Sequence, residues 1–104
     1  MTAARLSGPA QRDLHEIMRW IRKDSPRAAK KFGQEVLRAA ERLGEFPESG
    51  PHRPELGVPN VRVLSLAHFP YVLVYDPELP RPTILRVMHG ARDLPNVFGD
   101  AWNP

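Results

Sequence analysis

Two helix-start signals constrain the fold of this chain more than any other feature of its sequence. Ser7 and Ser25 are each followed within two residues by a proline, Pro9 and Pro26 respectively. A serine oxygen accepts a hydrogen bond from a free N–H group at a helix start, and proline fits the first helical turn. The second signal leaves almost no linker between the helices, so they should lie antiparallel. The sequence therefore predicts a helical hairpin over residues 8–44.

Each predicted helix carries an apolar stripe along one face. The first stripe follows the i, i+3, i+4, i+7 pattern and consists of Leu14, Ile17, Met18 and Ile21. The second consists of Ala29, Phe32, Val36, Ala40 and Leu43, with Leu37 at its edge. Trp20 lies off the first stripe and is expected to anchor its edge. The second helix is expected to end at Gly44, ahead of a proline.

Three β-rich runs follow the predicted hairpin, at residues 61–67, 71–75 and 83–89. Short, turn-bearing connections separate them, which favours antiparallel neighbours. The middle run is apolar or aromatic throughout, as expected of a strand at the centre of a sheet. Residues 3–6 are expected to add a short edge strand. The predicted fold class is α+β: an N-terminal strand, an antiparallel two-helix hairpin and an antiparallel sheet of three or more strands.

The length of the chain, 104 residues, is that of one ordinary domain. We expect residues 1–104 to form a single domain with the sheet at 61–89 and a C-terminal tail at 90–104. Prolines and glycines break up residues 47–60, which are therefore expected to form a long loop. A loop of this kind is either a binding loop or a plain connection that wraps around the domain.

Several functional classes are disfavoured by what the sequence lacks. It has no cysteine, which excludes a disulfide scaffold and a cysteine nucleophile and fits a cytoplasmic protein. No apolar run is long enough for a membrane helix. The four histidines have no metal-ligand spacing, and the glycines form no phosphate-binding loop. We therefore expect no metal, no cofactor and no membrane partner.

Basic residues near the end of the last predicted strand form the one candidate site. Arg86, His89 and Arg92 lie close along the chain, and Arg62 on the first of the three strands could join Arg86. Strict strand alternation places Arg86 on one face with Ile84 and Met88, and His89 on the other with Leu85 and Val87. In one interpretation the arginines bind a phosphate or carboxylate and His89 acts as acid or base. In the other, the arginines bind loop carbonyls or acidic residues and His89 caps the strand end.

Three segments resemble a known family when taken in this order along the chain. They are Leu6-Ser-Gly-Pro-Ala-Gln-Arg-Asp-Leu14, Phe46-Pro-Glu-Ser-Gly50 and Leu85-Arg-Val-Met-His-Gly-Ala-Arg-Asp93. Together they bracket nearly the whole chain and resemble ParE-type toxins of type II toxin–antitoxin modules, within the wider ParE/RelE superfamily. The resemblance implies a ParD-like antitoxin that wraps the toxin, and DNA gyrase as the target. RelE-type relatives instead cut messenger RNA on the ribosome.

The distribution of charge favours gyrase inhibition over RNA cleavage. Residues 1–50 hold ten Lys/Arg and seven Asp/Glu, whereas residues 51–104 hold five of each and no lysine. A ribosome-dependent nuclease needs several cations near the sheet to stabilise a developing phosphorane. The resemblance implies that RelE-like toxins often carry a catalytic tyrosine near the C-terminal end, and no tyrosine follows Arg86. We therefore expect an inhibitor and not an enzyme. The alternative is a RelE-like mRNA endonuclease that uses Arg62, Arg86 and His89, and a plain interaction protein without a toxic target is a third hypothesis.

Two contact surfaces follow from the resemblance. The expected target surface consists of Arg86, His89, Arg92, Phe98 and Trp102. An acidic antitoxin should bind the basic side chains of the second helix, through a groove that accepts a helix or an added strand; these side chains are Arg27, Lys30, Lys31 and Arg38. The same side chains could also be nothing more than a solvated helix face. Sequence-specific DNA binding by this chain alone is not expected.

Overall fold

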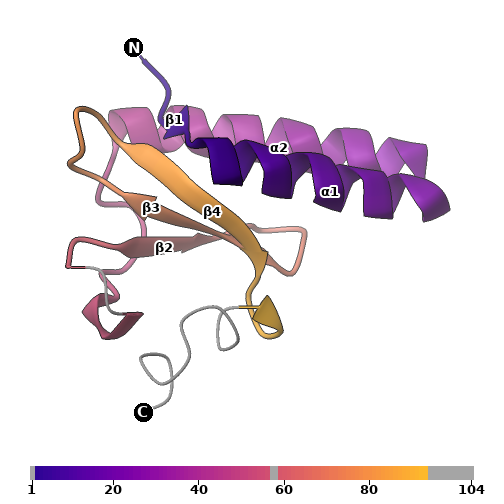
Figure 1. The fold of residues 1–104 in the computed structure, drawn as a ribbon. Coiled ribbons are helices and arrows are strands. Elements are labelled where there is room, and N and C mark those ends of the chain that lie inside the picture. The colour runs from indigo at the N-terminus through magenta and orange to yellow at the C-terminus, as the bar shows by residue number, and fades with distance from the viewer. Residues whose placement is uncertain (1, 57–58, 94–104) are drawn as a thin grey trace.

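The computed structural model describes residues 2–56 and 59–93 and places two helices on one face of a four-stranded sheet (Figure 1). The elements are β1 (Arg5–Leu6), α1 (Gly8–Asp24), α2 (Pro26–Glu45), η1 (Pro54–Leu56), β2 (Arg62–Ser65), β3 (Tyr71–Asp76) and β4 (Thr83–His89). Their order and the α+β class are those predicted from the sequence.

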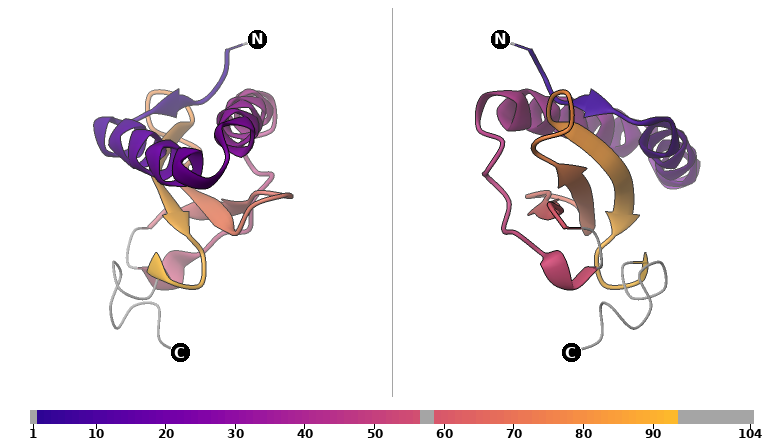
Figure 2. Two further views of the ribbon diagram at one scale, coloured as in Figure 1. Left: turned by 90° about the vertical axis from the view of Figure 1, so that its right-hand side faces the viewer. Right: turned by 60° about the vertical axis from the view of Figure 1, so that its left-hand side comes forward.

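Both predicted helix caps are present. The Ser7 and Ser25 hydroxyl oxygens each accept a hydrogen bond at 3.1 Å, from the N–H groups of Ala10 and Ala28 respectively. Ser25 also ends α1, because its own N–H group donates to the carbonyl of Ile21 at 2.9 Å. A single residue therefore joins the two helices, which explains why they lie side by side (Figures 1 and 2).

The prediction that α2 ends at Gly44 is wrong, because the helix continues to Glu45 and Phe46 caps it. Gly44 has a different role. A Cβ atom at this position would lie 2.0 Å from the carbonyl oxygen of Thr2, so only glycine lets the segment before β1 approach α2 so closely. A hydrogen bond of 2.8 Å from the Ala4 N–H group to the Ala40 carbonyl fixes the same segment on the helix.

The sheet has the order β1-β4-β3-β2, with β3 antiparallel to both of its neighbours. Every residue of β3 is buried, as predicted for a central strand. The short strand β1 lies at the edge, as expected, but it pairs with β4 in the parallel direction, so the sheet is mixed. No local signal records this direction, because the partner strand lies far away in the sequence.

A β-bulge in β4 overturns the predicted alternation of side chains. Val74 of β3 is opposite Arg86, but the next residue, Tyr75, is opposite Ile84, so Leu85 has no partner in the register. Ile84 and Val87 consequently face the helices, whereas Leu85 and Met88 belong to the apolar cluster on the other face. The sequence analysis had wrongly placed Ile84 with Arg86 and Met88, and Leu85 with Val87 and His89.

The segment between α2 and β2 covers the sheet face that the helices leave open (Figure 2). Leu56 of η1 is buried there in a cluster that also contains Val61, Val63, Val72, Val74 and Met88. The start of the segment is fixed by the buried Tyr75 hydroxyl, which accepts from Gly50 N–H at 2.9 Å and donates to the Pro47 carbonyl at 2.8 Å. Of the two interpretations of this loop, the structure supports the connection that wraps around the domain.

Candidate functional site

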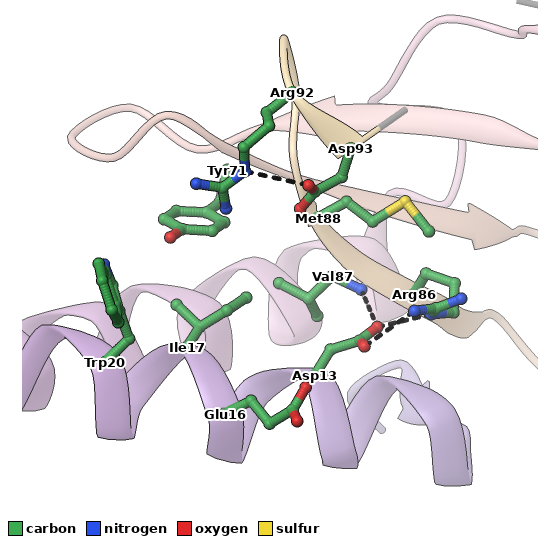
Figure 3. A pocket seen from close by; sticks show the side chains of 10 residues that line it. All are labelled: Asp13, Glu16, Ile17, Trp20, Tyr71, Arg86, Val87, Met88, Arg92 and Asp93. Atoms are coloured by element: carbon green, nitrogen blue, oxygen red, sulfur yellow. Dashed lines mark hydrogen bonds and ion pairs between the residues drawn. The ribbon is translucent and has the colours of Figure 1, made fainter. Parts of the chain in front are cut away.

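A hollow of about 410 Å³ opens between α1 and the C-terminal end of β4 (Figure 3). Its α1 side presents Asp13, Ile17 and Trp20, and its sheet side presents Tyr71 and Arg86 (Figure 3). The turn after β4 adds Arg92 and Asp93 to the rim. Two of the predicted target-binding residues, Arg86 and Arg92, therefore line one hollow.

The Asp13 carboxylate links α1 to β4. It accepts from Arg86 Nε at 2.7 Å, from Arg86 Nη2 at 3.0 Å and from the Val87 N–H group at 3.0 Å (Figure 3). The side chain of Asp13 is 13% exposed and that of Arg86 is 39% exposed. The hydrogen bonds to Asp13 raise the pKa of Arg86, so its positive charge is fixed. Arg86 is thus held by a neighbouring helix and does not extend freely towards solvent.

His89 and Asp93 close the end of β4. The His89 N–H group donates to the Asp93 carboxylate at 3.0 Å, and His89 Nδ1 accepts from the Arg92 N–H group at 3.1 Å. The His89 ring also packs edge-on against Tyr71, with 5.5 Å between centroids. Desolvation opposes ionisation of Asp93, but hydrogen bonds from Arg92 and His89 hold its pKa below the ordinary value. His89 therefore caps the strand end, as one of the two interpretations of the sequence predicted.

Arg62 does not join Arg86, contrary to the first interpretation. Its guanidinium donates to the Gly50 carbonyl at 2.8 Å, on the side of the sheet where the loop after α2 runs. Strand β3 separates the two arginines, and the register sets Arg62 opposite Tyr75 and Arg86 opposite Val74. The three groups of the nuclease alternative are consequently held by three different partners: loop carbonyls, Asp13 and the turn after β4.

The four basic residues predicted to bind an antitoxin are all exposed on α2; they are Arg27, Lys30, Lys31 and Arg38. Within the described part of the chain, none of them forms a hydrogen bond or an ion pair. The remaining target-binding candidates, Phe98 and Trp102, lie outside the described residues.

Sequence reasoning missed Asp13 as a site residue and misplaced Trp20. An acidic residue directly beside the apolar stripe of the first helix was a signal for the Asp13 contact, because a largely buried carboxylate needs a cationic partner. Trp20 does not anchor the stripe. It is 63% exposed at the hollow, with Lys23 Nζ 5.3 Å from its ring centroid (Figure 3).

Residues 2–56 and 59–93 contain no cluster of three or more histidine or acidic side chains that could hold a metal ion. In the same residues, no helix has both the length and the apolar character needed to cross a bilayer.

Comparison with known proteins identifies the family. The model of the ParE toxin of the type II toxin–antitoxin system parDE matches residues 4–94. The chain belongs to the ParE toxin family. One relative is the protein Y4kP of Sinorhizobium fredii (strain NBRC 101917 / NGR234), whose name describes it as a candidate toxin. It is 38% identical to this ParE-family chain over 90 residues, which cover 86% of this chain and 88% of the relative.

A solved structure shares the fold of this ParE-family chain. It is a chain from a structure titled the chromosomal ParDE TA system from P. aeruginosa, with a TM-score of 0.69 and 26% identity. The match covers 86% of the present chain and 96% of the other. The resemblance noted in the sequence is confirmed by all three comparisons.

Proposed function

We propose that this ParE-family chain inhibits DNA gyrase in the bacterial cytoplasm and that a ParD-like antitoxin neutralises it. Family membership supports a toxin role, but the wider superfamily contains both gyrase inhibitors and nucleases, so the fold does not choose between them. The choice rests on the candidate catalytic groups and on the way they are held.

The observation that carries the proposal is the separation of Arg62 from Arg86. An RNA-cleaving site stabilises a developing phosphorane with several cations that converge on one phosphate. Here Arg62 binds the Gly50 carbonyl and Arg86 binds Asp13, on different sides of β3. The described sheet residues also contain no lysine that could replace them. This arrangement favours an inhibitor that acts by binding over a nuclease.

Two surfaces support such binding in the proposal. Arg86 and Arg92 of the hollow, together with His89 at the end of β4, are proposed to contact gyrase. Phe98 and Trp102 remain candidates that follow them in the sequence. The exposed basic side chains of α2 are proposed to attract an acidic antitoxin (Arg27, Lys30, Lys31 and Arg38). The antitoxin part of the proposal requires that binding weaken strongly as salt rises to about 1 M, where the Debye length is about 3 Å.

Expression of the chain in bacteria tests the proposal in cells. We expect growth arrest, loss of negative supercoiling in an extracted reporter plasmid, and continued incorporation of labelled amino acids during the first minutes. Co-expression of the acidic ParD-like protein of the same module should restore growth. Immediate loss of amino-acid incorporation with an unchanged plasmid would instead support the RelE-like alternative, and normal growth would contradict any toxin role.

A further inference from the structure

A second groove, of about 260 Å³, lies between α2 and the C-terminal end of the edge strand β2. Its floor is apolar and includes Ala39, Leu64 and Leu66. Arg38 and Arg42 stand on successive turns of α2 at its rim, and Ser65 lies at its sheet side. Of the four basic residues assigned above to the antitoxin, only Arg38 lines this groove.

At this groove, no hydrogen bond within the described residues occupies the outward main-chain groups of β2. Leu66 N–H donates to the Tyr71 carbonyl at 3.0 Å, so the alternation of an antiparallel ladder makes Ser65 and Val72 a pair without hydrogen bonds. The N–H and C=O groups of Ser65 therefore point away from β3. Two residues earlier in β2, the Val63 N–H group also points outward, and it donates to the Pro51 carbonyl at 3.1 Å. The outer edge of β2 is thus closed up to Val63 and open at Ser65.

The groove also has uncompensated positive charge. Arg38 and Arg42 are exposed and form no ion pair within the described residues. The carboxylate that lines the groove, Glu35, is bound instead to His68, through the ring Nδ1 at 2.9 Å and the main-chain N–H at 3.2 Å. Burial alone would raise the pKa of Glu35, but these hydrogen bonds hold it below the ordinary value, so the carboxylate stays ionised beside His68.

We propose that this groove receives an extended acidic segment of the antitoxin, which adds to β2 at Ser65. Aliphatic side chains of the segment cover Ala39 and Leu64, and its carboxylates pair with Arg38 and Arg42. The proposal rests on neutralisation by an antitoxin, proposed above, and it narrows the contact surface from the whole outer face of α2 to one end of β2. Charge and main-chain edge together select an acidic strand over a basic or neutral one.

A dye-labelled peptide tests the groove directly. The probe is an end-blocked octapeptide. Leucine and glutamate alternate at its odd-numbered positions and threonine fills the even-numbered ones. In an added strand, all leucines and glutamates therefore lie on one face, towards α2. Its control carries glutamine in place of glutamate. By fluorescence anisotropy at low salt we expect the glutamate peptide to bind about tenfold more tightly, as two exposed ion pairs suggest. Equal affinities of the two peptides would overturn the proposal.

Variants of the chain locate the bound peptide. Arg38→Glu combined with Arg42→Glu should remove the preference for glutamate, whereas Arg12→Glu with Arg19→Glu, an equal charge change on exposed positions of α1, should keep it. Ser65→Pro removes the outward N–H group without breaking a bond to β3 and should weaken binding while thermal unfolding shows a folded protein. Full affinity in the Arg38/Arg42 variant would overturn the site, and full affinity in a folded Ser65→Pro protein would overturn the added strand.

The antitoxin itself separates failure of the groove from failure of the proposed function. We expect the ParD-like protein of the module to bind wild type at least tenfold more tightly than the Arg38/Arg42 variant, and to displace the glutamate peptide. If it binds both proteins equally, the groove is wrong and the antitoxin partner stands. If the peptide binds through Arg38 and Arg42 but the ParD-like protein does not bind wild type, the occupant proposed for the groove is wrong and neutralisation by that protein fails.

Discussion

Among single residues, Asp13 has the largest influence on the candidate site. Its carboxylate binds Arg86 twice and the Val87 N–H group once, and these bonds connect α1 to β4 across 73 and 74 positions of sequence. Because of these bonds, the Arg86 guanidinium stabilises the contact between α1 and β4 and does not extend freely towards solvent. Sequence spacing placed Arg86 near His89 and Arg92, but it could not show that a residue of the first helix would occupy its guanidinium.

We expect Arg86→Ala to lower the free energy of unfolding by about 1–3 kcal/mol, because it leaves the largely buried Asp13 carboxylate without its counter-charge. Chemical denaturation measures the change. Arg81→Ala is the control, since Arg81 is exposed and forms no ion pair in the described part of the chain, and its effect should stay within about 0.5 kcal/mol. Equal effects of the two substitutions would show that the Asp13–Arg86 contact does not stabilise the fold.

At the scale of elements, local signals predicted the helices, and long-range contacts decided the rest. The caps at Ser7 and Ser25 and the apolar stripes act within a few residues, so the hairpin could be predicted from the sequence. The bulge at Leu85 and the parallel pairing of β1 depend on how strands pair with one another, and the sequence analysis missed both. Gly44 was misinterpreted for the same reason: its function lies in a contact with Thr2 and not in ending α2.

Two glycines in α2 allow this interpretation of Gly44 to be tested. A Cβ at Gly44 would meet the Thr2 carbonyl at 2.0 Å, whereas at Gly33 it would meet the flexible end of Met18 at 3.0 Å. We therefore expect Gly44→Ala to destabilise the protein by about 1–3 kcal/mol and Gly33→Ala to be neutral or to stabilise it by up to about 1 kcal/mol. Thermal and denaturant unfolding give both values. A stabilising Gly44→Ala would contradict the close approach of the N-terminal segment.

In the molecule as a whole, the helical hairpin carries most of the exposed positive charge. Nine basic residues of α1 and α2 are exposed, against four acidic ones, because two of the six carboxylates in these helices bind Arg86 of β4 and His68 between β2 and β3. The sequence predicted that the helical half is basic. It did not predict that the exposed charge is more positive than the composition gives, which follows from the pairs Asp13–Arg86 and Glu35–His68. An acidic partner would therefore meet a stronger field at the hairpin than the net charge of +3 suggests.

The most direct test of the proposed function is supercoiling of relaxed plasmid DNA by purified gyrase in the presence of the purified chain. We predict inhibition that increases with the concentration of the chain. Arg92→Glu, at the rim of the hollow, should weaken inhibition, and the exposed Arg81→Glu should not. Undiminished supercoiling at a large excess of folded chain, together with cleavage of messenger RNA on translating ribosomes, would contradict the proposal that the chain inhibits gyrase.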